Sequence, residues 1–368
     1  MQTTFTEDQN QFREVVARFL QEKSQPSATR QLLESPTGYD ADVWQQLSGE
    51  IGLTGTHLPE AHGGFGFGPI ELGIAAEEMG RHLYAGPFFA SSVMASYALL
   101  HLGTPAARDA YLPALAAGTS LATLVLDSLD DPEQVGRRLN ASDGKITGTA
   151  PLVIDAEVAD QLIVIATEGG QRHLFALAAD ATGVTMAAVT SLDPTRRLAS
   201  VTFDNAEASA IGTVSDHELA ATWDHICVAL AHEMVGGAQH LLDSTIEYTK
   251  MRYQFGRPIG SFQGLKHRCA DLLTEVEWAK ATAHYAARCL DAGEGEPYIA
   301  SMAKAMASDT YMKAAKEAIQ MRGGIGFTWE EDTQLWYKRA KSSEVFMGTP
   351  SYHRERMMRM IELEEGAA

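Results

Sequence analysis

Cysteine is scarce in this chain of 368 residues, which contains only Cys227, Cys269 and Cys289. An odd, widely spaced set without a Cys-x-x-Cys pair supports neither a disulfide framework nor a zinc site. Such sparse use is typical of a reducing compartment, so we expect a cytoplasmic protein. The twelve histidines do not pair at metal-binding spacing, so no metal site is expected.

Basic residues are in the minority, with 29 Lys and Arg against 48 Asp and Glu and a net charge of −19. A surface this negative repels phosphate backbones and anionic lipid, so nucleic acid and membranes are not expected partners. The polar start of the chain lacks the basic and apolar regions of a signal peptide. The charge-free stretch between Arg81 and Arg108 contains Gly86, Pro87 and several serines, and we interpret it as a buried helix.

Helical and strand-like patterns occupy separate parts of the chain. Helices are expected over 41–51, 71–81, 91–102 and 106–117, where apolar residues recur at helical spacing. Short apolar runs separated by turn residues follow at 121–126, 162–166, 174–177, 184–189 and 199–203. Strands this close together, without helices between them, favour a small antiparallel barrel or sandwich. Long helices are then expected over 219–248, 262–292 and 297–321.

The predicted fold class is therefore α+β, with three domains. We expect an N-terminal helical domain over 1–118, a middle β domain over 119–213 and a C-terminal helical bundle over 214–368. Common catalytic signatures, such as a dinucleotide-binding Gly-x-Gly-x-x-Gly, a P-loop or a Gly-x-Ser-x-Gly elbow, are absent from the sequence. Any chemistry must therefore come from less general motifs.

Two segments are unusual on physical grounds. The first, Arg252-Tyr253-Gln254-Phe255-Gly256-Arg257-Pro258-Ile259-Gly260-Ser261-Phe262-Gln263, interrupts two long helices. Its arginines offer donors for phosphate, and its aromatic rings offer stacking faces for a planar ligand. The second, Gln320-Met321-Arg322-Gly323-Gly324-Ile325-Gly326-Phe327, has a glycine pair that lets backbone N–H groups approach a ligand. Each segment alone is also explained as a corner between two helices.

Taken in order, these motifs resemble the acyl-CoA dehydrogenase family over nearly the whole chain. The matching residues are Trp44, Leu47, Gly52-Leu53, Leu58-Pro59-Glu60, Gly63-Gly64 and Gly66, then Tyr248, Arg252, Gln254-Phe255-Gly256 and Phe262-Gln263, then Gln320, Gly323-Gly324 and Gly326-Phe327, and finally Arg339-Ala340-Lys341 and Phe346-Met347-Gly348-Thr349. The resemblance implies an N-terminal helical domain, a middle antiparallel β-barrel, a C-terminal four-helix bundle and a tetrameric assembly.

The resemblance also implies a reaction, the α,β-dehydrogenation of an acyl-CoA thioester. A carboxylate removes the α proton, while a hydride leaves the β carbon for FAD. Electron-transfer flavoprotein is the expected acceptor of the electrons. In the family the base is a Glu in the closing segment, and here Met347 occupies that position. Some members instead carry the base on the first C-terminal helix, where this sequence has Ile226 and Cys227.

The middle domain departs from the family pattern as well. The Trp-x-Thr that covers the flavin ring aligns with Leu152-Val153-Ile154, and the flavin-facing strand end aligns with the residues that follow Val125. The residues that reach a flavin seated in the neighbouring subunit are kept. The expected FAD-binding residues are Arg252, Gln254, Phe255, Phe262, Gln263, Gln320, Gly323 and Gly324.

This combination resembles the non-catalytic subunit of heterotetrameric acyl-CoA dehydrogenases of steroid side-chain breakdown. We therefore expect an α2β2 complex with a catalytic subunit of the same family. Glu233, Asp224 and Glu344 are the candidates for a displaced base, and Glu233 would be costly to bury unless it is paired. Two alternatives stay open: an active homomeric enzyme with an atypical base, and a scaffold or CoA-binding protein without redox chemistry.

Overall fold

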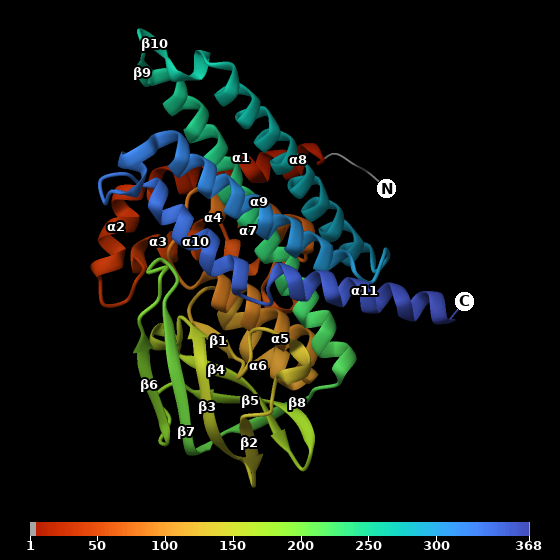
Figure 1. Cartoon of the computed structure of the whole chain (residues 1–368). Helices are drawn as coiled ribbons and strands as arrows, with labels where there is room; N and C mark the ends of the chain where they lie inside the picture. Colours follow the sequence, from red (N-terminus) through yellow and green to blue (C-terminus); the bar gives the residue numbers. More distant parts are fainter. Residues whose placement is uncertain (1–4, 368) are drawn as a thin grey trace. The chain divides into compact units, whose positions relative to one another are not determined.

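A computed structural model describes residues 5–367, with side chains described up to residue 362. The chain divides into two compact units, one of Met1–Thr29, Gly73–Tyr84 and Cys227–Ala368, the other of Arg30–Leu72 and Ala85–Ile226. None of the helices over the described residues combines the length and apolarity that a bilayer crossing requires. The α+β class is confirmed, because helices come first, then strands, then helices again (Figure 1).

Ten helical segments precede the first strand among the described residues, and the helices expected over 41–51, 71–81, 91–102 and 106–117 are found within a few residues. The ten segments are α1 (Glu7–Lys23), α2 (Pro26–Glu34), α3 (Ala41–Gln45), η1 (Gln46–Glu50), η2 (Leu53–Gly55), η3 (Glu60–His62), α4 (Pro69–Arg81), η4 (Phe88–Ala95), α5 (Ser96–Leu102) and α6 (Pro105–Ala116). Gly52 follows the continuous helix formed by α3 and η1 and has a φ of 74°, a left-handed backbone conformation that favours glycine. The charge-free stretch forms η4 and α5, and nearly all of its residues are buried, as predicted.

Eight strands form one sheet, drawn in yellow and green in Figure 1. They are β1 (Ala122–Val125), β2 (Leu139–Ser142), β3 (Lys145–Ile154), β4 (Gln161–Glu168), β5 (Gln171–Ala178), β6 (Val184–Val189), β7 (Leu198–Glu207) and β8 (Ser209–Thr213). Along the sheet the order is β6-β7-β3-β2-β4-β5-β8, and β1 pairs with β4. The glycine pair Gly169-Gly170 turns β4 into β5, as expected from the sequence.

The expected antiparallel barrel needs a correction, because the sheet is open and mixed. Among the described residues, β6 and β8 end the strand order and are not paired with each other. β1 runs parallel to β4, with Ala122 beside Gln161. Two parallel strands need a long crossover connection between them, and the segment that contains β2 and β3 provides it. The apolar core of the sheet centres on Val125, Ile146, Val164 and Phe175.

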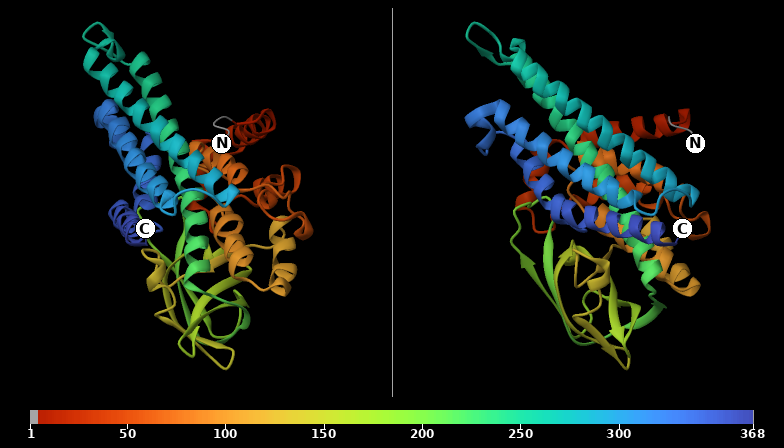
Figure 2. Two further views of the ribbon diagram at one scale, coloured as in Figure 1. Left: turned by 90° about the vertical axis from the view of Figure 1, so that its right-hand side faces the viewer. Right: turned by 45° about the vertical axis from the view of Figure 1, so that its right-hand side comes forward.

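The remaining elements follow the sheet in sequence. They are α7 (Asp216–Met251), β9 (Tyr253–Gln254), β10 (Arg257–Pro258), η7 (Ile259–Ser261), α8 (Gln263–Ala292), α9 (Ile299–Arg322), η8 (Gly323–Phe327), α10 (Thr333–Val345) and α11 (Pro350–Ala367). The three predicted long helices correspond to α7, α8 and α9. Figure 2 shows α8 and α9 side by side, with the β9–β10 hairpin at the end that α7 and α8 share.

Small side chains let α9 pack closely against its neighbours. Its alanines at 300, 303, 307, 314, 315 and 318 are all buried. The C-terminal part contains α10 and α11 besides the long helices, so the helical domain is confirmed with one helix more than the expected four. The change from helices to strands falls between α6 and β1, and the change back falls between β8 and α7. The domain boundaries after residues 118 and 213 stay a prediction.

Candidate functional site

The turn that should carry the catalytic base lies between α10 and α11 and contains Met347. Met347 is fully buried and has a left-handed backbone, with a φ of 58°. Its carbonyl oxygen lies 2.8 Å from Nε2 of His353 and 3.8 Å from Sγ of Cys227. Because a thioether offers no useful proton acceptor, this turn places a neutral side chain where proton abstraction is expected.

A buried lysine stabilises the same turn. The ammonium group of Lys304 on α9 lies 3.0 Å from the carbonyl oxygen of Ser343, 3.4 Å from that of Glu344 and 3.1 Å from that of Gly348. It also donates to Oγ of Ser308 at 3.1 Å. A buried ammonium is costly unless its donors are satisfied, and the last carbonyls of a helix need donors. Lys304 therefore meets both requirements at the end of α10.

A hydrogen-bonded relay supports the turn from α11. Nη1 of Arg356 donates to Oγ of Ser301 at 2.9 Å, and this oxygen lies 3.1 Å from Nδ1 of His353. Burial, followed by the positive charge of Lys304, lowers the pKa of His353 to about 3. The imidazole is therefore neutral at physiological pH, with Nδ1 accepting from Ser301 and Nε2–H donating to Met347. The turn is rigidly built although its side chain cannot act as a base.

Glu233, the leading candidate for a displaced base, is buried on α7 and paired. Its Oε1 atom lies 3.3 Å from Nη1 of Arg339 on α10. Nη2 of Arg339 reaches the carbonyl oxygen of Tyr84 at 3.4 Å. A buried carboxylate needs such a partner to remain charged, so this pairing accounts for the burial of Glu233 without a catalytic role. Whether Glu233 takes a proton stays untested.

The other two candidate bases lie at the protein surface or close to it. Glu344 is half-buried at the end of α10 and pairs with Lys341 one turn earlier. Asp224 is half-buried near the start of α7, beside His225. An i,i+3 ion pair on an exposed helix face is an ordinary surface contact. Neither environment resembles the enclosed setting that activates a carboxylate base.

The β9–β10 hairpin and the residues that flank it carry five of the eight predicted FAD-binding residues. Gln254 pairs with Arg257 across the hairpin, and Phe255 turns it with a φ of 54°. The ring of Phe255 is 91% exposed, and its centroid is 6.2 Å from that of Phe262. The guanidinium of Arg257 covers Phe262 at 4.0 Å. An aromatic side chain this exposed is available for stacking against a planar ring.

The last turn of α9, with Gln320, and the glycines that follow it supply the remaining predicted residues. Gly323 has a φ of 65°, and a Cβ atom on either Gly323 or Gly324 would meet nothing within 4 Å. The hydroxyl of Tyr248, at the base of the hairpin, lies 3.5 Å from the carbonyl oxygen of Arg322. The hairpin and the loop are therefore neighbours, and the structure brings the predicted residues to one end of the α7–α9 group.

These residues fit one arm of a dinucleotide better than a whole cofactor. Arg252, Gln254, Gln263 and Gln320 are exposed, and the open backbone at Gly323 leaves room for a pyrophosphate. Among the described residues none forms an ion pair with Arg252, so its guanidinium is available.

The segments expected to face a flavin ring are used for other contacts. Val153 and Ile154 belong to the buried part of β3, while Leu152 is 39% exposed. Asp127, just after β1, is buried, and its carboxylate accepts hydrogen bonds from the backbone N–H groups of Gly136 and Arg138. The Asp127 carboxylate therefore stabilises the loop between β1 and β2. Residues 152–154 include no aromatic side chain that could cover a flavin ring.

Sequence reasoning missed a buried charged cluster around Glu77 on α4. Its carboxylate oxygens lie 2.9 Å from Nη1 of Arg13 and 2.8 Å from Nε2 of His284. Nζ of Lys280 lies 3.6 Å from the same carboxylate. Burial acts to raise the pKa of Glu77, but His232, His284 and Arg13 together hold it well below its ordinary value. Glu77, His232 and His284 are metal-ligating types that converge here. The two cations already neutralise the carboxylate, so the cluster is an ion-pair network joining α1, α4, α7 and α8.

Comparison with known proteins gives a consistent result along the chain. Residues 6–119 match the family model "Acyl-CoA dehydrogenase, N-terminal domain", and residues 221–362 match "Acyl-CoA dehydrogenase, C-terminal domain". Acyl-CoA dehydrogenase IpdE2 of Mycobacterium tuberculosis is 34% identical over 94% of this chain and 94% of that protein. Acyl-CoA dehydrogenase FadE34 of the same organism is 31% identical over 95% of this chain but only 47% of that protein.

A solved structure shares the fold as well. A variant of the steroid ACAD Tcur3481-Tcur3483 superposes with a TM-score of 0.88 at 27% identity, covering 98% of this chain and 99% of that one. The matches to both terminal domains and the 34% identity over 94% of the chain leave no doubt about the relationship. The chain belongs to the acyl-CoA dehydrogenase family, whose cofactor is FAD, and its solved relatives include a steroid ACAD.

Proposed function

We propose that this chain is the flavin-supporting subunit of a heterotetrameric acyl-CoA dehydrogenase. A second subunit of the same family supplies the base, the seat of the flavin ring and most of the acyl-CoA site, and the complex passes electrons to electron-transfer flavoprotein. The observation that carries the proposal is Met347, a buried thioether in the turn where the family places its base. At the alternative position on the first C-terminal helix the sequence has Ile226 and Cys227, so no carboxylate stands there either.

The retained surface defines what the chain contributes. Arg252 pairs with the pyrophosphate of a flavin in the partner, Phe255 stacks on its adenine end, and the N–H groups near Gly323 approach its phosphates. When bound, FAD accepts the hydride that leaves the β carbon of the thioester. The exposure of Phe255, at 91%, supports this assignment, because an isolated protein gains nothing by presenting such a ring to water.

Two of the relatives support a paired assembly. The name Tcur3481-Tcur3483 joins two designations in one steroid ACAD. The match to FadE34 covers 47% of that protein, which leaves room in the same polypeptide for a second chain of this length. We therefore expect a CoA thioester with a steroid-derived acyl group as the substrate of the complex.

The two alternatives make different predictions about the isolated protein. An active homomeric enzyme needs a base, and the best-placed carboxylate, Glu233, is engaged by Arg339 at 3.3 Å. A scaffold or CoA-binding protein needs no flavin in any assembly. If the chain is an active homomeric enzyme, the isolated protein is yellow and active. If it is a scaffold or CoA-binding protein, the isolated chain and any complex that it forms are colourless.

Co-expression tests the proposal. The chain is produced alone and together with family members from the same genome that carry Glu at the position of Met347. Acyl-CoA-dependent reduction of a dye acceptor is then measured for each preparation. We expect activity only in a co-purifying complex. Full activity of the chain alone, or no complex with any such member, contradicts the proposal.

A further inference from the structure

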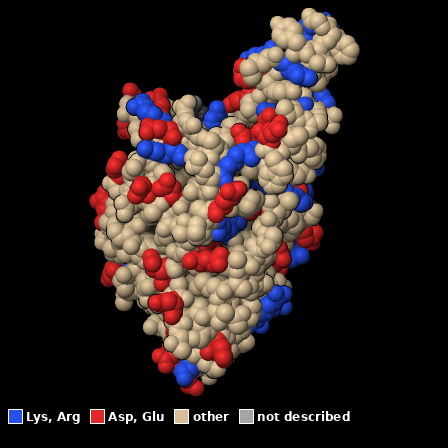
Figure 3. All heavy atoms as spheres, turned by 90° about the vertical axis from the view of Figure 1, so that its left-hand side faces the viewer, with Lys and Arg blue, Asp and Glu red and all other residues tan. Residues whose placement is uncertain are grey.

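Arg322 lies between Gln320 and Gly323, yet its surroundings differ from those of the other arginines nearby. Arg252 and Arg257 are exposed at the hairpin end, which is coloured tan and blue at the top of Figure 3. The side chain of Arg322 is only 5% exposed. A buried guanidinium must satisfy its donors within the protein, so the contacts of Arg322 show what this residue does.

The guanidinium of Arg322 makes three contacts with α7. Its Nη1 donates to Oγ1 of Thr245 at 3.0 Å, and its Nη2 donates to Oγ of Ser244 at 3.2 Å. Its central carbon lies over the ring of Tyr248, 5.2 Å from the centroid. Because the group is planar and its donors have fixed directions, these contacts set both its position and its orientation against α7.

The same guanidinium is also fixed to its own part of the chain. Nε of Arg322 lies 2.8 Å from Oε1 of Glu331, and this oxygen also accepts from Oγ1 of Thr333 at 2.9 Å. Nη1 has a second acceptor, the carbonyl oxygen of Ala318 on α9, at 3.3 Å. Glu331 supplies the countercharge that a buried guanidinium needs. Arg322 therefore ties the end of α9, and the chain after η8, to α7.

This tie lies between the two groups of expected FAD-binding residues. One group begins with Arg252 at the end of α7, and the other includes Gly323 at the end of α9. The hydroxyl of Tyr248 donates to the carbonyl oxygen of Arg322 at 3.5 Å, and the carbonyl oxygen of Tyr248 accepts from the N–H of Arg252 at 2.9 Å. Over the described part of the chain, every hydrogen bond between α7 and residues 320–324 involves Arg322. A continuous set of contacts thus connects the two groups.

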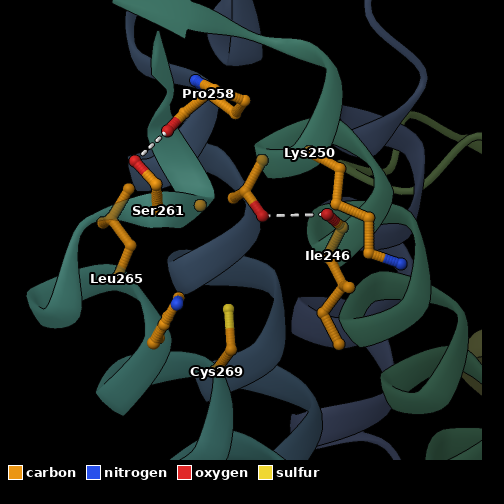
Figure 4. Close-up of a pocket in the computed structure, with 9 residues that line it drawn as sticks. Ile246, Lys250, Pro258, Ser261, Leu265 and Cys269 are labelled. Carbon is orange, nitrogen blue, oxygen red and sulfur yellow. Dashed lines mark hydrogen bonds between the residues drawn. The ribbon is translucent and has the colours of Figure 1, made fainter.

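The hairpin is shaped by contacts of a different kind (Figure 4). Ser261 donates to the carbonyl oxygen of Pro258 at 2.7 Å, and Thr249 donates to that of Ile246 at 2.8 Å, as the dashed lines show. Both hydroxyl groups line a pocket of about 410 Å³ between α7 and α8. Neither hydrogen bond reaches the segment after α9. The hairpin and the end of α7 are therefore held by local contacts, whereas Arg322 places them beside that segment.

We propose that Arg322 is a positioning residue for FAD binding. It holds the N–H groups near Gly323 in register with the guanidinium of Arg252, so that one dinucleotide meets both at once. Fixing two binding groups in advance removes part of the entropic cost of binding. The inference rests on the proposed function and deepens it, because it names the residue that makes two separate segments act as one site. The single nitrogen of a lysine cannot serve Glu331 and the acceptors on α7 together.

Thr245→Val tests this role while leaving Arg322 and its charge partner in place. The change removes the acceptor of Nη1 on α7. FAD affinity is measured by titrating the apo-complex and following flavin fluorescence, and we expect it to weaken about three- to tenfold. Thr249→Val, the same change one turn later on α7, is the matched control, because its hydroxyl bonds only within its own helix. It should leave the affinity within about twofold of wild type.

A double-mutant cycle with Arg252→Ala separates positioning from general stability. Once the register is lost, removing Arg252 should cost much less. We expect Arg252→Ala to weaken FAD binding about tenfold to hundredfold in the wild-type background, but at most about threefold beside Arg322→Lys. Melting temperatures are recorded for each complex. Arg13→Lys, which alters the ion pairs of Glu77, is the control for lost stability alone and should leave FAD affinity nearly unchanged.

Equal costs of Arg252→Ala in both backgrounds overturn the inference, because the two residues then act independently. It is also overturned if Thr245→Val binds FAD as tightly as Thr249→Val. If Arg322→Lys lowers the melting temperature as Arg13→Lys does and keeps the FAD affinity of wild type, Arg322 is a structural residue only. Failure of the wild-type chain to form any flavin-containing heteromer is a separate result, since it removes the proposed function and this inference with it.

Discussion

The ammonium nitrogen of Lys304 lies 3.1 Å from the carbonyl oxygen of Gly348, so a buried charge on α9 fixes the turn that surrounds Met347. His353 holds the preceding carbonyl oxygen, that of Met347, from the other side at 2.8 Å. Neither contact involves the side chain at position 347. These hydrogen bonds of the turn therefore do not depend on a carboxylate at position 347, and the loss of a base is compatible with an ordered turn.

Replacing Lys304 tests this role. Lys304→Met keeps most of the buried volume but leaves three carbonyl oxygens without their donor. Each unsatisfied buried group costs about 1 to 3 kcal/mol, so we expect the free energy of unfolding to fall by about 2 to 4 kcal/mol in urea titrations. Lys316→Met, an exposed position on the same helix, should change it by less than about 0.5 kcal/mol. Equal effects of the two variants would show that Lys304 does not organise the turn.

Arg252 tests the flavin arm. Arg252→Ala should remove a charge-assisted contact worth about 1.5 to 3 kcal/mol, which weakens FAD binding by the complex about tenfold to hundredfold. Arg252→Lys should restore only part of it, because the bidentate fork is lost. FAD affinity is measured by titrating the apo-complex and following flavin fluorescence. Arg359→Ala, an exposed arginine on α11, is the control. Unchanged affinity in a folded Arg252→Ala complex would show that the pyrophosphate lies elsewhere.

The three candidate carboxylates test the source of the base. Glu233→Gln, Asp224→Asn and Glu344→Gln should each leave the turnover number of the complex within a few-fold, whereas losing a general base costs about 10²- to 10⁴-fold. Glu233→Gln also removes the carboxylate that lies 3.3 Å from the buried guanidinium of Arg339, so flavin content and stability are measured alongside. A hundredfold loss with intact flavin content would identify that residue as the base.

The converse substitution probes the same question. Met347→Glu buries a carboxylate in a fully enclosed position and should not produce activity in the isolated chain, because Leu152, Val153 and Ile154 stand where the ring-covering Trp-x-Thr of the family is expected. The measurement is acyl-CoA-dependent dye reduction by the purified variant. Restored turnover without a partner would show that the ring site is present after all.

Buried histidines make the fold sensitive to acid. Burial, followed by the nearby His225, lowers the pKa of His101 to about 4, and burial lowers those of His240 and His284 to about 4. The unfolded chain therefore binds protons first, so stability is fully present above about pH 6.5 and declines as the pH falls towards 4. Replacing one such histidine by a residue that does not titrate should reduce the slope of the free energy of unfolding against pH by about 1.4 kcal/mol per pH unit.

His101→Gln provides that measurement. Its imidazole Nδ1 lies 3.2 Å from Oγ1 of Thr222, and glutamine can keep a hydrogen bond without titrating. Urea titrations between pH 4.5 and 6 compare wild type, His101→Gln and the exposed-site variant His267→Gln. A slope identical to that of wild type would mean that His101 is protonated equally in the folded and unfolded states.

Motifs with fixed spacing located the site better than composition did. Met347 and the expected FAD-binding residues could be named from the sequence because they sit in contiguous segments, and the roles of those residues stay predictions. Lys304 could not, because lysine is almost never fully buried and only the end of α10 explains its position. β3 was missed because Gly148 and Pro151 interrupt its alternation, and the parallel pairing of β1 with β4 depends on contacts far apart in sequence. The Glu77 network likewise needed four helices to be placed before its partners were visible.

The flavin-to-protein ratio tests the central claim most directly. The chain is purified alone and as the complex with its base-bearing partner, and FAD is quantified by absorbance against protein concentration. If this chain lends an arm to a flavin seated in the partner, the isolated chain binds little FAD and the complex binds about one per pair of unlike subunits. One FAD per chain in the isolated protein would contradict the account, because the chain would then hold the whole cofactor by itself.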